Sequence, residues 1–277
     1  MHIRSLVALL MVCAVVGLLI AEETSPSEEG IVKEVAGLGG IDWTNRAAFA
    51  IGIGGVNPDL PPSTWRRGAI RAAEMDAYRN LLEIIKGVYI TSETTVENAI
   101  TTSDVIRTKI EGYLQCPKKS EPRYKSDGSI EIRVEVPLTR EIMESLGLVD
   151  QMPEEVVPLS GEKGKPRYTG LVIDARGIGL EPALAPRVLN EDGQEIFGVS
   201  MVPRNKLPED GLVVYVGNVD LAKEHPRVGD NPIVVKGLRA EGKYRTDVVV
   251  SNEDARKILE SEDPGFLHSA KVVIVLD

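Results

Sequence analysis

Residues 65–86 read WRRGAIRAAEMDAYRNLLEIIK, and this stretch decides the fold. Apolar and small side chains recur in it at spacings of three and four, as on one face of an amphipathic helix. These side chains are Ile70, Ala73, Ala77, Leu81 and Ile84. The alanines would let the helix backbone approach a sheet closely. The sequence therefore predicts one long helix packed on a sheet, N-capped at Ser63 or Thr64 and stopped by a left-handed Gly87.

Strand patterns flank this helix on both sides. Residues 49–53 alternate, residues 88–96 are rich in β-branched side chains, and residues 130–136 alternate strictly between apolar and charged side chains. Asp127-Gly128 marks the hairpin turn that precedes the last of these strands. The first domain, residues 41–150, is therefore predicted as a βαββ-type α+β unit.

The rest of the chain is predicted as a second, mixed β-rich α+β domain at residues 168–277. It begins with an apolar strand at residues 168–175, and Asp192-Gly193 is a strong hairpin signal. Residues 251–260 open with SNED, which favours a helix because acidic residues suit its first turn. Residues 151–167 contain three prolines and no periodicity, so they are predicted to be the linker.

The N-terminus has the pattern of a secretory signal. Arg4 is followed by residues 6–20, which carry no charge, and an apolar run of about 7–15 residues is typical of a signal peptide. Residues 1–21 are therefore predicted as a signal peptide, with an uncleaved membrane anchor as the alternative. Residues 22–40, acidic and then glycine-rich, are predicted as a flexible tether. We expect an exported protein of the periplasm or the envelope.

Charge and cysteine content limit the chemistry. The net charge of −10 argues against nonspecific binding to nucleic acid. A chain without its leader would keep only Cys116, which excludes an intramolecular disulfide; we expect this thiol to be structural and half-buried. The glycine-rich segments at residues 52–57 and 161–166 lack the spacing of phosphate-binding loops, and the isolated His225 and His268 form no zinc motif. No cofactor, metal or catalytic residue is predicted.

Two groups of residues are candidate contacts. Asp174 and Arg176 follow an apolar strand, and with Asp230 they could line a ligand site between the domains; the alternative is an ordinary Asp–Arg turn pair. On the long helix, Arg66, Arg67 and Arg71 could dock an acidic partner or could pair with nearby acids. Trp65, which begins the helical pattern, either anchors that contact or fills the core. These two alternatives remain open from the sequence.

A family resemblance covers residues 45–148. The segment at residues 67–82, RGAIRAAEMDAYRNLL, resembles the Ala-rich helix of the Lpp-twenty-type envelope lipoproteins and of the N-terminal domain of the flagellar assembly protein FlgT. The segments at residues 87–95 and 127–138 continue the likeness, and residues 168–177 look like the second domain often joined to that unit. The resemblance implies an exported, non-enzymatic protein, and some members build rings around the flagellar motor.

Three functions are compatible with the sequence. The first is a non-enzymatic envelope assembly or scaffold protein, with the flagellum as one candidate location, that docks other envelope proteins or copies of itself through sheet edges and helix faces. The second is a periplasmic module that binds an envelope ligand near Asp174, Arg176 and Asp230. The third is a hydrolase that uses carboxylates, Asp174 among them. The leader, the motif content and the resemblance favour the first.

Overall fold

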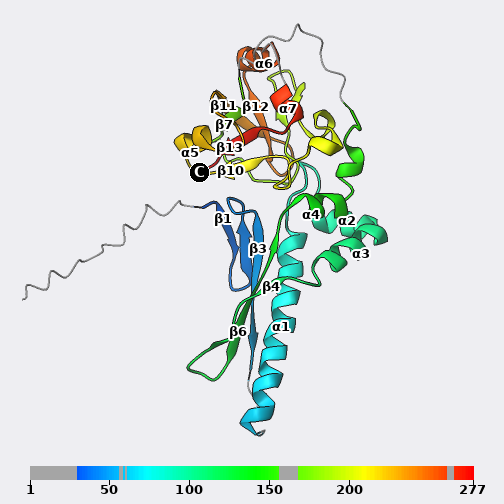
Figure 1. The fold of residues 1–277 in the computed structure, drawn as a ribbon, viewed down its shortest axis with the longest axis vertical. Coiled ribbons are helices and arrows are strands. Elements are labelled where there is room, and N and C mark those ends of the chain that lie inside the picture. Colours follow the sequence, from blue (N-terminus) through cyan, green and yellow to red (C-terminus); the bar gives the residue numbers. More distant parts are fainter. Residues whose placement is uncertain (1–29, 56–58, 60, 156–167, 261–264) are drawn as a thin grey trace, which may run out of the picture.

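The computed structural model describes residues 30–55, 59, 61–155, 168–260 and 265–277. These residues form two α+β units stacked into an elongated molecule (Figure 1). The fold class predicted from the sequence is therefore confirmed. The predicted signal peptide lies outside the described residues, as do residues 156–167 of the predicted linker.

The first domain is built on an antiparallel sheet with the strand order β1-β2-β3-β6-β4, in which β5 also pairs with β6. Its strands are β1 (Val32–Val35), β2 (Gly39–Asp42), β3 (Ala47–Gly54), β4 (Lys118–Lys119), β5 (Arg123–Tyr124) and β6 (Ile130–Pro137). The alternation predicted for the last strand is confirmed, because Ile130, Ile132 and Val134 are buried while the charged residues between them face outward.

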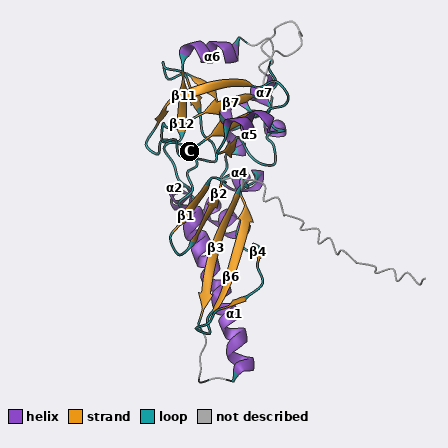
Figure 2. Ribbon diagram, turned by 90° about the vertical axis from the view of Figure 1, so that its left-hand side faces the viewer, coloured by secondary structure: helices purple, strands orange, loops and turns teal. Residues whose placement is uncertain are grey.

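The long helix α1 (Pro62–Lys86) lies along one face of this sheet (Figure 2). Two glycines of β3 allow the close approach: a Cβ at Gly52 would lie 2.1 Å from the carbonyl oxygen of Ala73, and one at Gly54 would lie 1.9 Å from that of Ala69. Small residues on both elements thus bring backbone against backbone. The predicted helix is confirmed, although its ends differ in detail.

The helix begins at Pro62, ahead of the predicted caps Ser63 and Thr64, and proline suits a first helical position because its missing N–H needs no partner there. At the other end, Gly87 has a right-handed φ of −74°, so the predicted left-handed stop is wrong. The N–H of Gly87 still reaches the carbonyl oxygens of Glu83 and Ile84, which continues the right-handed turn through this residue.

Part of the predicted tether belongs to the first sheet. Residues 32–35 form β1 and residues 39–42 form β2, so the sheet begins before the predicted start at residue 41. The glycines serve close packing: a Cβ at Gly39 would lie 2.1 Å from the carbonyl oxygen of Phe49, and one at Gly40 would lie 2.6 Å from that of Lys33.

Residues 88–96 form no strand beyond a single bridge between Tyr89 and Thr95. Helix α2 (Val96–Thr102) begins at the end of this segment, where a capping box at Thr95 and Asn98 satisfies backbone donors that a strand would have paired. Two further helices, α3 (Asp104–Tyr113) and α4 (Arg140–Ser145), and the 3-10 turn η1 (Val149–Gln151) complete the domain.

The second domain contains a mixed sheet with the order β10-β13-β7-β11-β12-β8-β9. Its strands are β7 (Leu171–Asp174), β8 (Val188–Leu189), β9 (Glu195–Phe197), β10 (Val214–Val216), β11 (Ile233–Glu241), β12 (Asp247–Val250) and β13 (Val272–Val275). Its helices are α5 (Val219–Glu224), α6 (Asn252–Leu259) and α7 (Gly265–His268), with 3-10 turns η2 (Val199–Met201) and η3 (Arg204–Lys206). The predicted hairpin at Asp192-Gly193 joins β8 to β9 and is confirmed.

One hydrophobic core runs through both domains. The same cluster includes Ala73 and Leu81 of the first domain and Leu171 and Tyr215 of the second. A smaller cluster on the other face of the second sheet lies against Ala222 of α5. Domains that share a large apolar interface do not move freely against each other, so the two units form one body.

Candidate functional site

The junction between the domains contains a buried arginine from the first of them. Arg46, in the turn before β3, is 5% exposed. It donates from Nε to the carbonyl oxygen of Leu138 at 3.0 Å and from Nη1 to that of Val213 at 2.8 Å. Burial lowers the pKa of Arg46 to about 10. Its φ of 50° lies in the left-handed region, which costs roughly 1–2 kcal/mol for an L residue, and these bonds offset that cost.

A second buried arginine reaches the same stretch of backbone from the other side. Arg227 donates from Nε to the carbonyl oxygen of Ala270 at 2.7 Å and from Nη2 to that of Gly211, and its Nη1 lies 3.0 Å from the carboxylate of Asp210. Loss of water lowers the pKa of Arg227. The carbonyl groups just before β10 therefore bind two guanidinium groups, one from each domain.

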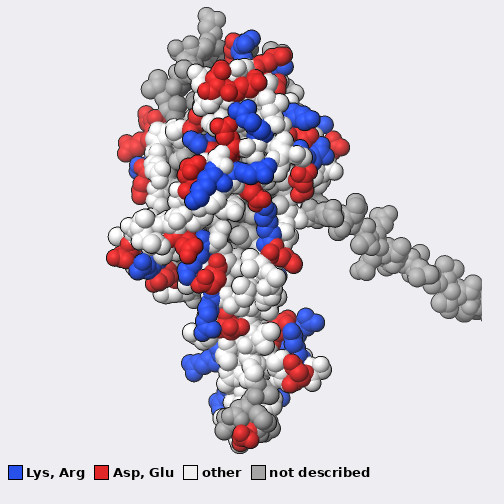
Figure 3. All heavy atoms as spheres, turned by 180° about the vertical axis from the view of Figure 1, so that it is seen from behind, with Lys and Arg blue, Asp and Glu red and all other residues white. Residues whose placement is uncertain are grey.

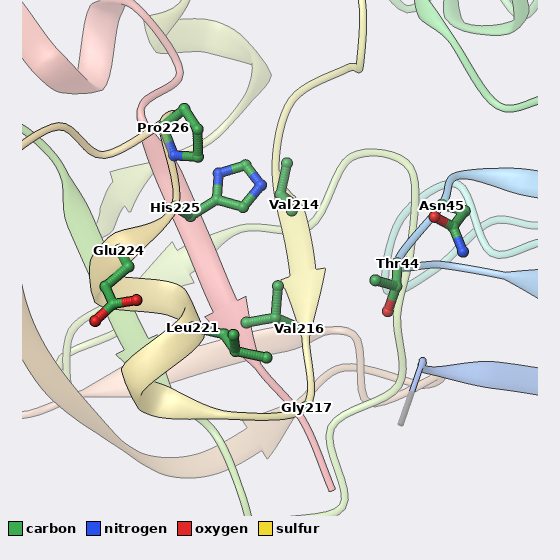
Figure 4. Close-up of a pocket in the computed structure, with 9 residues that line it drawn as sticks. All are labelled: Thr44, Asn45, Val214, Val216, Gly217, Leu221, Glu224, His225 and Pro226. Carbon is green, nitrogen blue, oxygen red and sulfur yellow. The ribbon is translucent and has the colours of Figure 1, made fainter. Parts of the chain in front are cut away.

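A pocket of about 420 Å³ opens beside these arginines (Figure 4). It lies between the edge strand β10, helix α5 with the following His225-Pro226, and the turn at Thr44-Asn45 of the first domain. Val214, Val216, Leu221 and Pro226 make its apolar walls. Its volume lies in the range of about 300–1,000 Å³ that is usual for small-molecule sites.

His225 supplies this pocket with a directed polar group. Its Nδ1 accepts the backbone N–H of Arg227 at 3.1 Å, so the proton of the neutral ring sits on Nε2. Figure 4 shows the ring pointing across the pocket toward β10. Burial, with the charge of Arg227, lowers the pKa of His225, so the ring is neutral at pH 7. The pocket therefore offers the Nε2–H donor of His225 beside apolar side chains and the polar side chains of Thr44, Asn45 and Glu224.

A second polar cluster joins the domains around Asp247. This carboxylate is fully buried and accepts bonds from Ser92 Oγ at 2.6 Å, from the Arg187 backbone N–H at 3.0 Å and from Arg187 Nε at 2.9 Å. Nearby, the rings of Tyr89 and Tyr244 stack with centroids 4.8 Å apart. Ser92, Asp247 and Arg187 thus hydrogen-bond to one another, and these bonds link the two domains.

Asp174 and Arg176 form a local pair. Arg176 donates to both carboxylate oxygens of Asp174 at 2.8 Å, and this bond lowers the pKa of Asp174. Asp230 lies at the opposite end of β7, because Asn231 bonds to Thr169 just before that strand while Asp174 ends it. At a rise of about 3.3 Å per residue, the two ends of β7 alone lie roughly 10 Å apart. The structure therefore does not bring the three predicted residues into one site.

In the part of the chain that the structure describes, the candidate arginines of α1 do not form the ion pairs with nearby acids that were one alternative from the sequence. Glu74 pairs with Lys119 at 3.1 Å and Glu83 with Lys86 at 2.7 Å, which removes two of the acids expected to neutralise the arginines. Within the described ranges, no ion pair forms at Arg66, Arg67 or Arg71. Trp65 is half-buried with the Arg66 guanidinium 6.0 Å from its ring, whereas the tryptophan of the core is Trp43.

Other sequence expectations concern Cys116, metal ions and the membrane. Cys116 is exposed, so the expectation of a half-buried thiol is wrong; it lies in a turn just after α3, where no layer covers it. Across the described segments, histidine, cysteine and acidic side chains do not gather in groups of three or more suited to a metal ion. The helices of those same segments include none with the length and hydrophobicity of a membrane span.

The junction residues were not identifiable from the sequence. Arg46 stands alone before a strand, and Ser92, Arg187 and Asp247 lie far apart in the chain without any shared motif. The local signal near Ser92 is the polar segment TSET at residues 91–94, which fits a turn as well as a site. Charges over the rest of the surface are mixed: Figure 3 shows acidic and basic side chains interspersed on one face.

Comparison with known proteins concerns the second domain. Residues 170–277 match the family model described as Treponema pallidum Tp0624, second domain. The match begins just before β7 and includes the whole of the second sheet. No curated protein matches the chain. The second domain is thus similar to the second domain of Tp0624, and the resemblance of residues 45–148 rests on the sequence segments given above.

Proposed function

We propose that this protein is a non-enzymatic, exported cell-envelope component that acts in assembly or as a scaffold, with the flagellar base as one candidate location. The leader pattern of residues 1–21 and the resemblance of residues 45–148 to the Lpp-twenty and FlgT units support this proposal.

The observation that carries the proposal is that the buried charged side chains at the domain junction are hydrogen-bonded to groups of the junction itself. Arg46, Arg227 and Asp247 are the groups that an enzyme could use at a domain junction, and each is hydrogen-bonded to groups of the junction, with Nη2 of Arg46 the one nitrogen of that side chain left without a partner in the described structure. Together with the shared core they make one body. A body of this kind presents fixed surfaces at a fixed spacing, which suits a structural component.

The free strands at the edges of the first sheet discourage pairing with another sheet. Strand β4 consists of Lys118 and Lys119, and lysines on an edge strand commonly prevent it from pairing with a strand of another molecule. If β1 strands of two copies paired antiparallel, one central register would place Lys33 directly opposite Lys33, and the other would place Glu34 opposite Glu34. Like charges directly opposite each other are destabilising, so both registers are unfavourable. Helix faces are therefore better docking surfaces in this domain than the sheet edges.

Crosslinking in intact cells, followed by identification of the crosslinked proteins, tests the proposal. We expect envelope proteins or copies of this chain to be recovered, and we expect a deletion strain to have impaired envelope integrity or motility. A deletion strain with normal motility and an intact envelope, together with no specific crosslink, would contradict the proposal.

A second candidate function is binding of an envelope ligand in the His225 pocket. Its volume and the directed N–H donor of His225 favour this candidate over a site at Asp174. A ligand at 100 times its dissociation constant should add about 2.7 kcal/mol to the stability of the fold. Thermal shifts with cell-wall fragments, compared between the wild type and Leu221→Arg, which blocks the pocket, test it; equal shifts in both would rule out this pocket.

A further inference from the structure

The outward side of α1 carries a row of residues that no other element of the described chain covers completely. Arg67, Arg71, Met75, Tyr78 and Leu82 follow one another at spacings of three and four, so they lie on one side of the helix. We call this row the α1 stripe. Met75 is 60% exposed, which is unusual for an apolar side chain on a packed helix.

The end of the stripe nearest the start of the helix is basic. Arg67 and Arg71 are exposed, and the acids around them are bound elsewhere: Glu74 by Lys119 at 3.1 Å and Asp76 by Arg79 at 3.7 Å. Their charges are therefore available to a partner. Figure 1 shows no other helix beside this lower part of α1.

The other end of the stripe is an apolar pocket with an acidic rim. A hollow of about 270 Å³ lies between α1 and α3, lined by Tyr78, Leu82 and Leu114 with Glu111 and Gln115. Glu111 is exposed and forms no ion pair within the described residues. The α1 stripe thus runs from unpaired arginines through an exposed methionine to an apolar hollow, and Glu111 of α3 lies at the rim of that hollow.

We propose that the α1 stripe is a homodimer interface in which α1 packs antiparallel against α1 of a second copy. This inference rests on the proposed function, because it names one of the surfaces used in assembly. With a two-fold axis between Met75 and Tyr78, Met75 of each copy enters the hollow of the other. The same axis sets Arg71 of one copy opposite Leu82 of the other, because each lies about 8 Å along the helix from it. Glu111 lines the hollow together with Leu82, so Arg71 of one copy then faces Glu111 of the other.

Self-pairing accounts for both ends of the stripe. An isologous contact requires a surface that is complementary to itself. The basic start of the stripe and Glu111 at the rim of the hollow satisfy this when the helices run antiparallel. An anionic lipid surface would use the arginines but would be repelled at Glu111. An acidic partner protein would leave the hollow without a matched side chain.

Sedimentation velocity of the full chain tests the interface. At about 100 µM, well above the Kd of a weak micromolar contact, we expect a dimer that dissociates as salt is raised. Arg71→Glu and Glu111→Arg should each weaken the dimer about tenfold or more, and the double variant Arg71→Glu/Glu111→Arg should restore it, because the reversed charges again face each other. Arg256→Glu, an exposed reversal on α6, is the control and should leave the dimer unchanged.

Each contrary result overturns the inference. These results are a monomeric wild type, a dimer that survives both single reversals, and a double variant that stays monomeric. The leader is the same in every variant, so association through it cannot imitate the pattern of loss and restoration.

A photoreactive residue at Met75 separates this inference from the proposed function in cells. A crosslink between two copies supports the dimer, provided that the same residue placed at Val105, which is 65% exposed on α3, gives none. A crosslink from Met75 to a different envelope protein alone would overturn the dimer and leave the proposed assembly function standing.

Discussion

Arg46 of the first domain donates from Nη1 to the carbonyl oxygen of Val213 in the second, over 2.8 Å. Only 5% of this arginine is exposed, so the bond crosses the domain junction inside the core. Val213 immediately precedes β10, the edge strand that forms one wall of the His225 pocket. The bond therefore fixes both the docking of the domains and the shape of that pocket.

Arg46→Ala should lower the free energy of unfolding by about 3 kcal/mol, because it leaves the buried carbonyl groups of Leu138 and Val213 without a donor. Chemical denaturation measures this loss. Arg79→Ala is the matched control, since its side chain is 74% exposed and a surface change stays within about 0.5 kcal/mol. A loss no greater than that of the control would show that the bond does not hold the junction.

Gly52→Ala should be strongly destabilising, by about 3 kcal/mol or more, because the new Cβ would meet the carbonyl oxygen of Ala73 at 2.1 Å and force α1 away from β3. Gly55→Ala is the control, since a Cβ there has no atom within 4 Å among the neighbours in the described chain. Thermal unfolding followed by circular dichroism compares the two, and similar midpoints would mean that α1 does not pack on the sheet this closely.

Asp247→Asn should cost about 3 kcal/mol of stability, because an amide nitrogen would face the donors of Ser92 and Arg187. A double-mutant cycle with Ser92→Ala should give a coupling energy of about 1 kcal/mol, which two independent sites would not show. Glu241→Gln, in an exposed pair with Arg239, should change stability by no more than about 1 kcal/mol.

Tyr113 should make stability depend on alkaline pH. Burial raises the pKa of Tyr113 to about 12 from an ordinary value of 10, so the folded state holds this proton more tightly than the unfolded state does. Its contribution is complete below pH 10 and is lost as the pH rises from 10 to 12. Tyr113→Phe should therefore flatten this part of the stability curve, measured by denaturation at pH 9, 10 and 11. Parallel curves for the two proteins would contradict the shift.

Local sequence signals predicted the elements whose cause is local. The spacing of Ala73, Ala77 and Leu81 is confirmed in α1, the Asp192-Gly193 turn in the β8–β9 hairpin, and the helix start with acidic residues at 251–254 in α6. Each depends on residues within a few positions of one another, so the amino acids alone specify it. The strand predicted at residues 88–96 is wrong because the capping box at Thr95 is a stronger local signal than β-branched content.

The sequence by itself thus determined the fold class, the long helix, and the first strand and the Asp192-Gly193 hairpin of the second domain. Only the tertiary structure decided that residues 32–35 pair into the first sheet, that Asp174 and Asp230 lie at opposite ends of β7, and that Arg46 meets Val213. The physical reason is the range of the interactions. Helix periodicity, caps and turns act between neighbours in the chain, whereas strand pairing and domain docking join residues far apart in it, and their partners are set by topology.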